Sequence, residues 1–232
     1  MKVSKTESIG GTINVSLETV EQSAPSALSR EQFTELEEFL GFSSGRLKPV
    51  TPNQRANQSE HGLVLYGDFP SWGVKFPLSP FVLQFLNYLE ITPAQLSGMA
   101  WCYLNSFEYI FEEYKEKFTE CPLNVPTVPV FLHYFNFQQD KSWVTARRRR
   151  HLFHNINKVD RHTDKFVFLP RNPDHEHLDA GWREFVDEDW KVQIYIPGRR
   201  ELNCWEKICI DTIESIKKGI IFCKLALFVF NM

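Results

Sequence analysis

The stretch SPFVLQFLNYLEITPAQL, residues 79–96, contains two helix starts in succession and decides how the first half of the chain folds. Ser79 offers a capping oxygen, and the proline that follows it lacks a backbone N–H that a first helical turn would leave unpaired anyway. Thr92 and the proline after it repeat this arrangement, and Gln95 completes a capping box. Helical spacing behind Ser79 is kept by Val82, Phe85, Leu86 and Leu89. The stretch therefore predicts one helix and the start of the next.

The longest helix is predicted at about residues 99–117, and prolines at 122, 126 and 129 end it. Its apolar stripe consists of Phe107, Ile110, Phe111, Tyr114 and Phe118. Its polar side consists of Glu112, Glu113, Lys115 and Glu116. Of the 33 aromatic residues in the chain, 18 lie between Tyr66 and Phe137, so the hydrophobic core is predicted there. An aromatic stripe at this spacing is typical of a core rather than of a stacking platform.

The N-terminal part of the chain has a different composition. Residues 1–28 are rich in Ser, Thr, Gly and Glu and lack aromatic residues, which predicts a disordered tail. A capping box from Ser29 to Gln32 then predicts a short amphipathic helix near residues 30–40, with Gly41 as its left-handed end. Residues 42–61 have the composition of a linker.

Short strands are predicted in the second half of the chain, at residues 142–145, 165–169 and 192–196, each between turn residues. The predicted fold class is therefore α+β, with a mainly helical first half and a small β-containing segment after residue 140. We expect three parts: residues 1–61 as a disordered tail with one helix, 62–197 as the folded domain, and 198–232 as a divergent C-terminal tail.

The overall composition limits the function classes. The 232 residues carry a net charge of −3, whereas proteins dedicated to nucleic acid or membrane surfaces usually have a global basic excess. Five cysteines without a C-x-x-C pair indicate a reduced intracellular protein, and no apolar signal segment follows the N-terminus. We expect a nuclear or cytoplasmic protein that is not secreted. The apolar run at 219–230 contains Lys224 and is shorter than a membrane span, so it is interpreted as a buried element, with a membrane anchor or the end of a broken reading frame as alternatives.

A family resemblance rests on the run GVKFPLSPF at 73–81, its continuation through residues 82–96, and Trp101. These residues resemble the plant gypsy-type transposon protein family, whose members share a P-L-x-P-F start, an aromatic helix, a P-x-Q-L turn and a second helix with an early Trp. The resemblance covers roughly residues 62–197, and the chain after about Cys204 departs from the pattern. It implies descent from a retroelement, near the Gag-like portion, and it provides no catalytic residues.

A strongly basic block extends from Lys141 to Arg171, with nine Lys and Arg against two Asp. Basic side chains interleaved with aromatic ones suit phosphate contact and base stacking. The candidate nucleic-acid-binding residues are Trp143, Arg147, Arg148, Arg149, Arg150 and Lys158. Four consecutive arginines also fit a nuclear-import signal. The alternative is that the block is solvated, or paired with the acidic residues at 172–190 across a hairpin.

Metal and catalytic motifs are weak. Histidines at 151, 154, 175 and 177, and the pair Cys204 and Cys209, lack the ligand geometry of a zinc site, and the Gag-type zinc knuckle is absent. The protease, polymerase, P-loop and nucleophile-elbow signatures are absent as well. The acidic residues at 184–189 leave a degenerate metal-dependent nuclease or integrase-like enzyme as the alternative function.

We therefore expect a non-catalytic, retroelement-derived protein that acts by Gag-like self-association or by weak, non-specific nucleic-acid binding. We expect no catalytic residue, metal or cofactor, no small-molecule ligand and no membrane partner.

Overall fold

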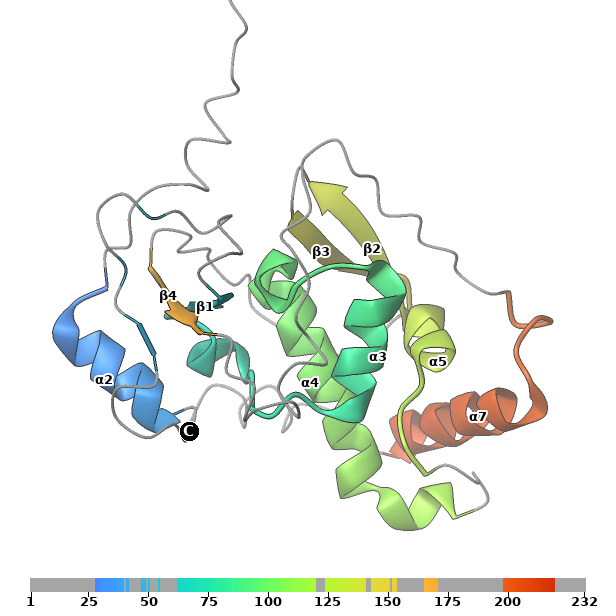
Figure 1. Cartoon of the computed structure of the whole chain (residues 1–232). Helices are drawn as coiled ribbons and strands as arrows, with labels where there is room; N and C mark the ends of the chain where they lie inside the picture. The colour runs from blue at the N-terminus through green and yellow to red at the C-terminus, as the bar shows by residue number, and fades with distance from the viewer. Residues whose placement is uncertain are drawn as a thin grey trace, which may run out of the picture.

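The structure is a computed structural model of the whole chain (Figure 1). It describes residues 28–39, 41, 47–48, 50, 54, 62–119, 124–140, 143–150, 152–153, 165–170 and 198–219. Residues 1–27 of the predicted tail at 1–28, and the predicted strand at 192–196, lie outside these residues. Within them, helices and two small antiparallel sheets confirm the predicted α+β class.

The described helices occupy most of the first half of the chain and one segment near its end. The α-helices are α2 (Arg30–Phe39), α3 (Pro80–Leu89), α4 (Gly98–Glu113), α5 (Val128–Tyr134) and α7 (Cys204–Gly219). Short 3-10 helices are η2 (Pro70–Trp72), η3 (Pro93–Gln95) and η4 (Lys115–Phe118). The strands are β1 (Leu63–Tyr66), β2 (Phe135–Asp140), β3 (Trp143–Arg148) and β4 (Phe166–Leu169). In Figure 1, α2 and the β1–β4 sheet lie on one side, α7 lies on the other, and α3, α4 and α5 lie between them.

The predicted helix starts are confirmed by their hydrogen bonds. Ser79 Oγ accepts from the backbone N–H of Val82 at 3.1 Å and caps α3. The capping box of η3 forms as predicted, because the Thr92 backbone N–H donates to Gln95 Oε1 at 3.3 Å and the Thr92 hydroxyl accepts in return. The reciprocal pair at the start of α2 joins Ser29 and Gln32. Local sequence thus determines where these helices begin.

The two sheets differ in how far apart their strands lie in the sequence. β2 and β3 form an antiparallel hairpin in which Phe135 lies opposite Arg148. β1 pairs with β4, and the Gly67 backbone N–H donates to the Lys165 carbonyl oxygen at 2.8 Å just beyond the paired residues. Gly62 precedes β1 with a φ of 134°, and a Cβ there would lie 2.3 Å from the Leu169 carbonyl oxygen. A side chain at this position would therefore push β1 away from β4.

Phe131 of α5 is at the centre of the aromatic core. Its ring centroid lies 5.5 Å from that of Phe81 and 5.3 Å from that of Phe85, both on α3, and 5.1 Å from that of Phe107 on α4. Two of these pairs are edge-to-face, an arrangement that contributes about 0.5–1.5 kcal/mol per pair beyond burial. The predicted aromatic stripes are thus core, and α5 joins them.

The C-terminal helix α7 departs from expectation. We expected residues 198–232 to be a tail separate from the domain, but the described part of that segment packs into the same core. Ile210 and Ile213 are fully buried, and α7 contacts α5 and η4. The apolar spacing of α7 therefore forms a core face.

Candidate nucleic-acid interface

The four consecutive arginines lie where β3 ends, beside the C-terminal end of α5. Their side chains are all exposed. Arg147 and Arg148 belong to β3, opposite Asn136 and Phe135. The backbone N–H groups of Arg149 and Arg150 both donate to the carbonyl oxygen of Tyr134, at 2.9 and 3.0 Å. These two hydrogen bonds fix the end of the arginine run against the last residue of α5.

The arginines do not form one continuous surface. Arg148 donates from Nη1 to the Phe153 carbonyl oxygen at 3.3 Å. Burial raises the pKa of the Tyr103 phenol, and the positive charge of Arg148 opposes that shift, so Arg148 also lies near Tyr103. Side chains alternate along a strand, which separates Arg148 from its neighbour Arg147.

Arg149 and Arg150 act on a different group, His133 in the last turn of α5. The His133 side chain is buried, and burial lowers its pKa to about 4. The positive charges of Arg150, Arg149 and Arg199 add to this shift, and Glu214 opposes it. His133 is therefore neutral at pH 7, within a positive potential that three arginines create together.

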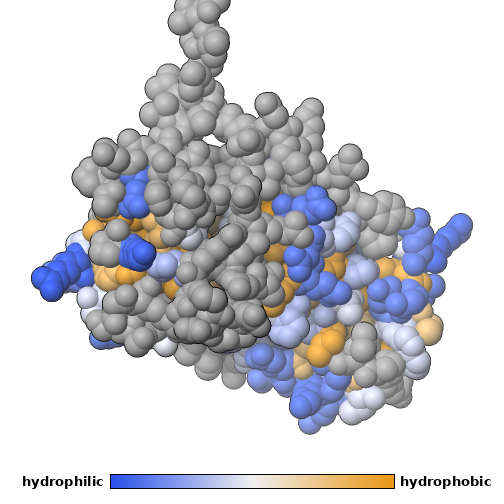
Figure 2. Space-filling model, viewed as in Figure 1, coloured by the Kyte–Doolittle hydropathy of each residue, from blue (hydrophilic) through white to orange (hydrophobic). Residues whose placement is uncertain are grey.

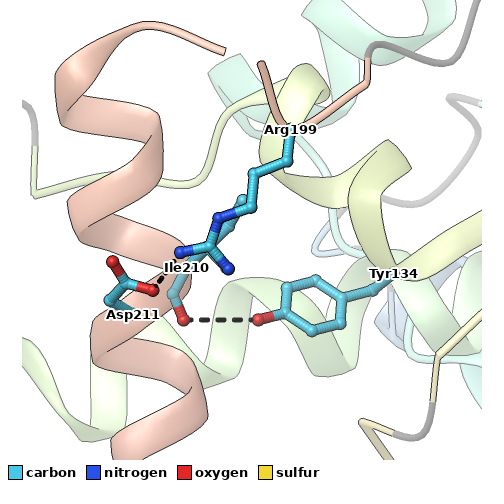
Figure 3. A network of polar contacts seen from close by, with 4 residues as sticks. All are labelled: Tyr134, Arg199, Ile210 and Asp211. Carbon is cyan, nitrogen blue, oxygen red and sulfur yellow. Dashed lines mark hydrogen bonds and ion pairs between the residues drawn. The ribbon is translucent and has the colours of Figure 1, made fainter. Parts of the chain in front are cut away.

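Arg199 is a member of this group that sequence reasoning did not identify, since it is far from Arg150 in the chain. It precedes α7, and its Nη2 lies 2.5 Å from Oδ1 of Asp211 on that helix (Figure 3). Figure 3 also shows the Tyr134 hydroxyl directed at the Ile210 carbonyl oxygen, at 3.5 Å. We call Arg149, Arg150 and Arg199 the cationic cluster.

Two carboxylates of α7 lie beside the cationic cluster. Besides Asp211, Glu214 contributes a negative charge near Tyr134, and its Oε2 lies 3.4 Å from the Lys217 Nζ. Burial raises the pKa of Tyr134 above its usual range, and the negative charge of Glu214 adds to the rise. Figure 2 shows hydrophilic and hydrophobic residues intermixed on the side of the molecule that carries α7, so this face is not uniformly charged.

The remaining predicted site residues lie elsewhere. Trp143 is only 3% exposed, and its ring lies 5.5 Å from that of Tyr66 in the core. An indole in that position is not available to stack on a base. Lys158 lies outside the described residues. Arg149, Arg150 and Arg199 therefore all act on His133, whereas Arg148 and Trp143 lie in other surroundings.

Most of the candidate metal ligands lie outside the residues that the structure describes. The acidic residues at 184–189 and the histidines at 151, 154, 175 and 177 are among the residues that the structure does not describe. Within the described ranges, no group of three or more His, Cys, Asp and Glu side chains could hold a metal ion. Cys102 and Cys204 have free thiols, whereas Cys209 is disulfide-bonded, contrary to the expectation of reduced cysteines.

A separate cavity of about 270 Å³ lies between α2 and the turn after β1. Its lining includes Leu36, Phe39, Asp68, Pro70 and Lys165. This volume is below the usual range for a small-molecule site, about 300–1,000 Å³. The cavity shares no lining residue with the cationic cluster and adds nothing to it.

Compared with family models, with curated proteins and with solved structures, the chain matches none of them. Among the helices that the structure describes, none has the length and apolar character needed to cross a membrane.

Proposed function

We propose that this chain is a non-catalytic protein of retroelement descent that binds nucleic acid weakly and without sequence preference through the cationic cluster. The observation that supports this most directly is the convergence of Arg149, Arg150 and Arg199 on His133. Two segments far apart in the sequence contribute positive charge to one place. A guanidinium group matches the geometry of a phosphate, and it stays charged at any physiological pH.

Binding of this kind acts on the phosphate backbone. Each phosphate that an arginine neutralises releases counterions, so the affinity falls as salt rises. Base recognition would need exposed aromatic or polar groups beside the arginines, and Trp143 does not provide one because it is buried. We therefore expect single-stranded and duplex DNA to bind with affinities of the same order.

The test is a fluorescence-anisotropy titration of a labelled oligothymidylate and a labelled duplex over about 50–200 mM salt. The double variant Arg149→Gln/Arg150→Gln should bind several-fold more weakly, and the slope of log K against log salt should flatten. The backbone bonds to Tyr134 do not need these side chains, so the variant should keep its fold. The matched control is Arg30→Gln/Lys48→Gln, which removes the same charge from exposed positions outside the cluster.

Two results would contradict the proposal. Binding that does not change with salt would exclude a phosphate contact. Equal weakening in the cluster variant and in the control would show that only the net charge matters, and not this place on the surface.

The other functions considered have less support. The exposed large apolar residues Phe39, Tyr88, Val125 and Trp205 lie on separate segments, so among the described residues no single apolar surface favours self-association. Light scattering on the same samples measures the oligomeric state directly. The nuclease alternative depends on residues 184–189, and a Mg²⁺-dependent cleavage assay of the full chain tests it. Retroelement descent is tested by sequencing the gene's flanks for long terminal repeats.

A further inference from the structure

This inference rests on the function proposed above. We infer that Asp211 on α7 competes with nucleic-acid phosphate for Arg199, so that the chain's own helix limits the affinity of the cationic cluster. Asp211 would be an affinity-determining residue that opposes binding, in contrast to the arginines that support it.

Arg199 and Asp211 form a direct ion pair. Arg199 Nη2 and Asp211 Oδ1 are 2.5 Å apart, in the range of a direct charge-assisted hydrogen bond (Figure 3). A phosphate oxygen would approach the same guanidinium edge, because carboxylate and phosphate present similar pairs of acceptor oxygens. Arg199 cannot satisfy both partners fully at that edge.

This ion pair is weak because both of its side chains are exposed. The side chains of Arg199 and Asp211 are 52% and 63% exposed. Ion pairs exposed to this degree contribute little to stability and are screened by salt, so the guanidinium can be exchanged between partners. A buried pair would instead be part of the fold and would not open for a ligand.

The helix that carries Asp211 has a fixed position. The opposite face of α7 is held in the core by Ile210 and Ile213, so the helix cannot turn its carboxylates away. Glu214 lies three residues after Asp211, a spacing that places both carboxylates on one side of the helix. Glu214 acts on His133 and Tyr134, the same groups on which Arg150 and Arg199 act. Competition therefore takes place by exchange of side-chain partners rather than by detachment of α7.

The test extends the anisotropy titration with oligothymidylate to Asp211→Asn. Removing the carboxylate frees Arg199, so the affinity at low salt should rise by up to about fivefold. The slope of log K against log salt should steepen by up to about 0.7, the value for one additional phosphate contact on a single strand. The matched control is Glu38→Gln on α2, which removes the same charge from an exposed position on the other side of the molecule.

A double-mutant cycle makes the test specific. In the background of Arg199→Gln, Asp211→Asn should have no more effect than Glu38→Gln, because the competitor then has no arginine to occupy. Thermal melts of each variant should stay near the wild type. Asp211→Ser is the second variant, in case asparagine at this position disturbs α7.

The outcomes separate the two proposals. If the wild type binds through Arg149 and Arg150 but Asp211→Asn and Asp211→Ser gain no more than Glu38→Gln, the competition is overturned and the binding function stands. The competition is also overturned if Asp211→Asn still raises the affinity in the Arg199→Gln background. If neither the wild type nor the Asp211 variants bind oligothymidylate, the binding function itself is overturned.

Discussion

The backbone N–H of Arg150 donates a hydrogen bond of 3.0 Å to the carbonyl oxygen of Tyr134, and the N–H of Arg149 shares that acceptor at 2.9 Å. The carbonyls in the last turn of a helix have no partner within the helix, so these bonds satisfy one of them at the end of α5. They also place two positive charges at the negative end of the helix dipole, which is favourable. The position of the cationic cluster is therefore a consequence of how α5 ends.

The packing of α7 predicts that truncating Ile213 destabilises the protein. Its side chain is fully buried, so Ile213→Ala should lower the free energy of unfolding by about 2–4 kcal/mol. Ser215→Ala, at an exposed position on the same helix, should change it by less than about 0.5 kcal/mol. Urea denaturation measures both values. If both variants unfold at the wild-type midpoint, α7 is not part of the cooperative unit.

Ser97 is expected to couple the start of α4 to β3. Its Oγ accepts from the Ala100 backbone N–H at 3.2 Å, and its hydroxyl lies 3.1 Å from Thr145 Oγ1. Ser97→Ala should cost about 1–2 kcal/mol, because it removes the helix cap and the link to the strand. Thr145→Val removes only the link and serves as the comparison. A double-mutant cycle should give a non-zero coupling energy, and strict additivity would show that the two hydroxyls do not interact.

His133 predicts a loss of stability at mildly acidic pH. Its pKa falls from the usual 6.5 to about 4 in the folded chain, first because of burial and then because of Arg150, Arg149 and Arg199, against Glu214. Between pH 6.5 and about pH 4, His133 binds a proton in the unfolded chain but stays neutral in the folded chain. The free energy of unfolding therefore falls as the pH falls through this range. The full effect is roughly 3 kcal/mol and is absent above the unfolded pKa.

The measurement is the free energy of unfolding between about pH 7 and pH 5, a range in which most carboxylates stay ionised. The wild type should lose more stability over this range than His133→Gln, which cannot titrate. Parallel curves for the two proteins would mean that the pKa of His133 is not lowered in the folded state.

The burial of Trp143 predicts that its substitution lowers stability rather than nucleic-acid affinity. The indole is a core group beside Tyr66, so Trp143→Ala should lower the free energy of unfolding by about 3–5 kcal/mol. Trp205→Ala should lower it by less, since that side chain is 47% exposed. Provided that the variant stays folded, its affinity for oligothymidylate should equal that of the wild type. A selective loss of affinity at unchanged stability would restore Trp143 to the interface.

Local signals predicted the helix starts because a cap depends on residues only three positions apart. The boxes from Ser29 to Gln32 and from Thr92 to Gln95 are examples. The same kind of reasoning missed α5, since prolines at 126 and 129 indicated only the end of a helix. Pro129 in fact lies in the first turn of α5, where its missing N–H costs little. β1 was missed because LVLY has no alternation, and all four of its residues are buried.

The sequence predicted only part of the candidate site, because Arg149 and Arg150 were identified from it and Arg199 was not. A run of arginines can be read directly, but the shared influence of Arg199, Arg149 and Arg150 on His133 depends on tertiary structure and leaves no local pattern. The burial of Trp143 also depends on β1, a strand that was not predicted. Spacing along the chain could not show which basic residues share one place, nor which aromatic ones face the solvent.

The pairing of β1 with β4 has a further consequence for chain connectivity. The hydrogen bond from Gly67 to Lys165 brings the two ends of the segment 67–165 together, and that segment contains α3, α4, α5 and the β2–β3 hairpin. Bringing together residues so distant in sequence is entropically costly, so the pairing is expected to form late in folding, after the helices and the hairpin. With its entry and exit side by side, the segment has the geometry of an insertion.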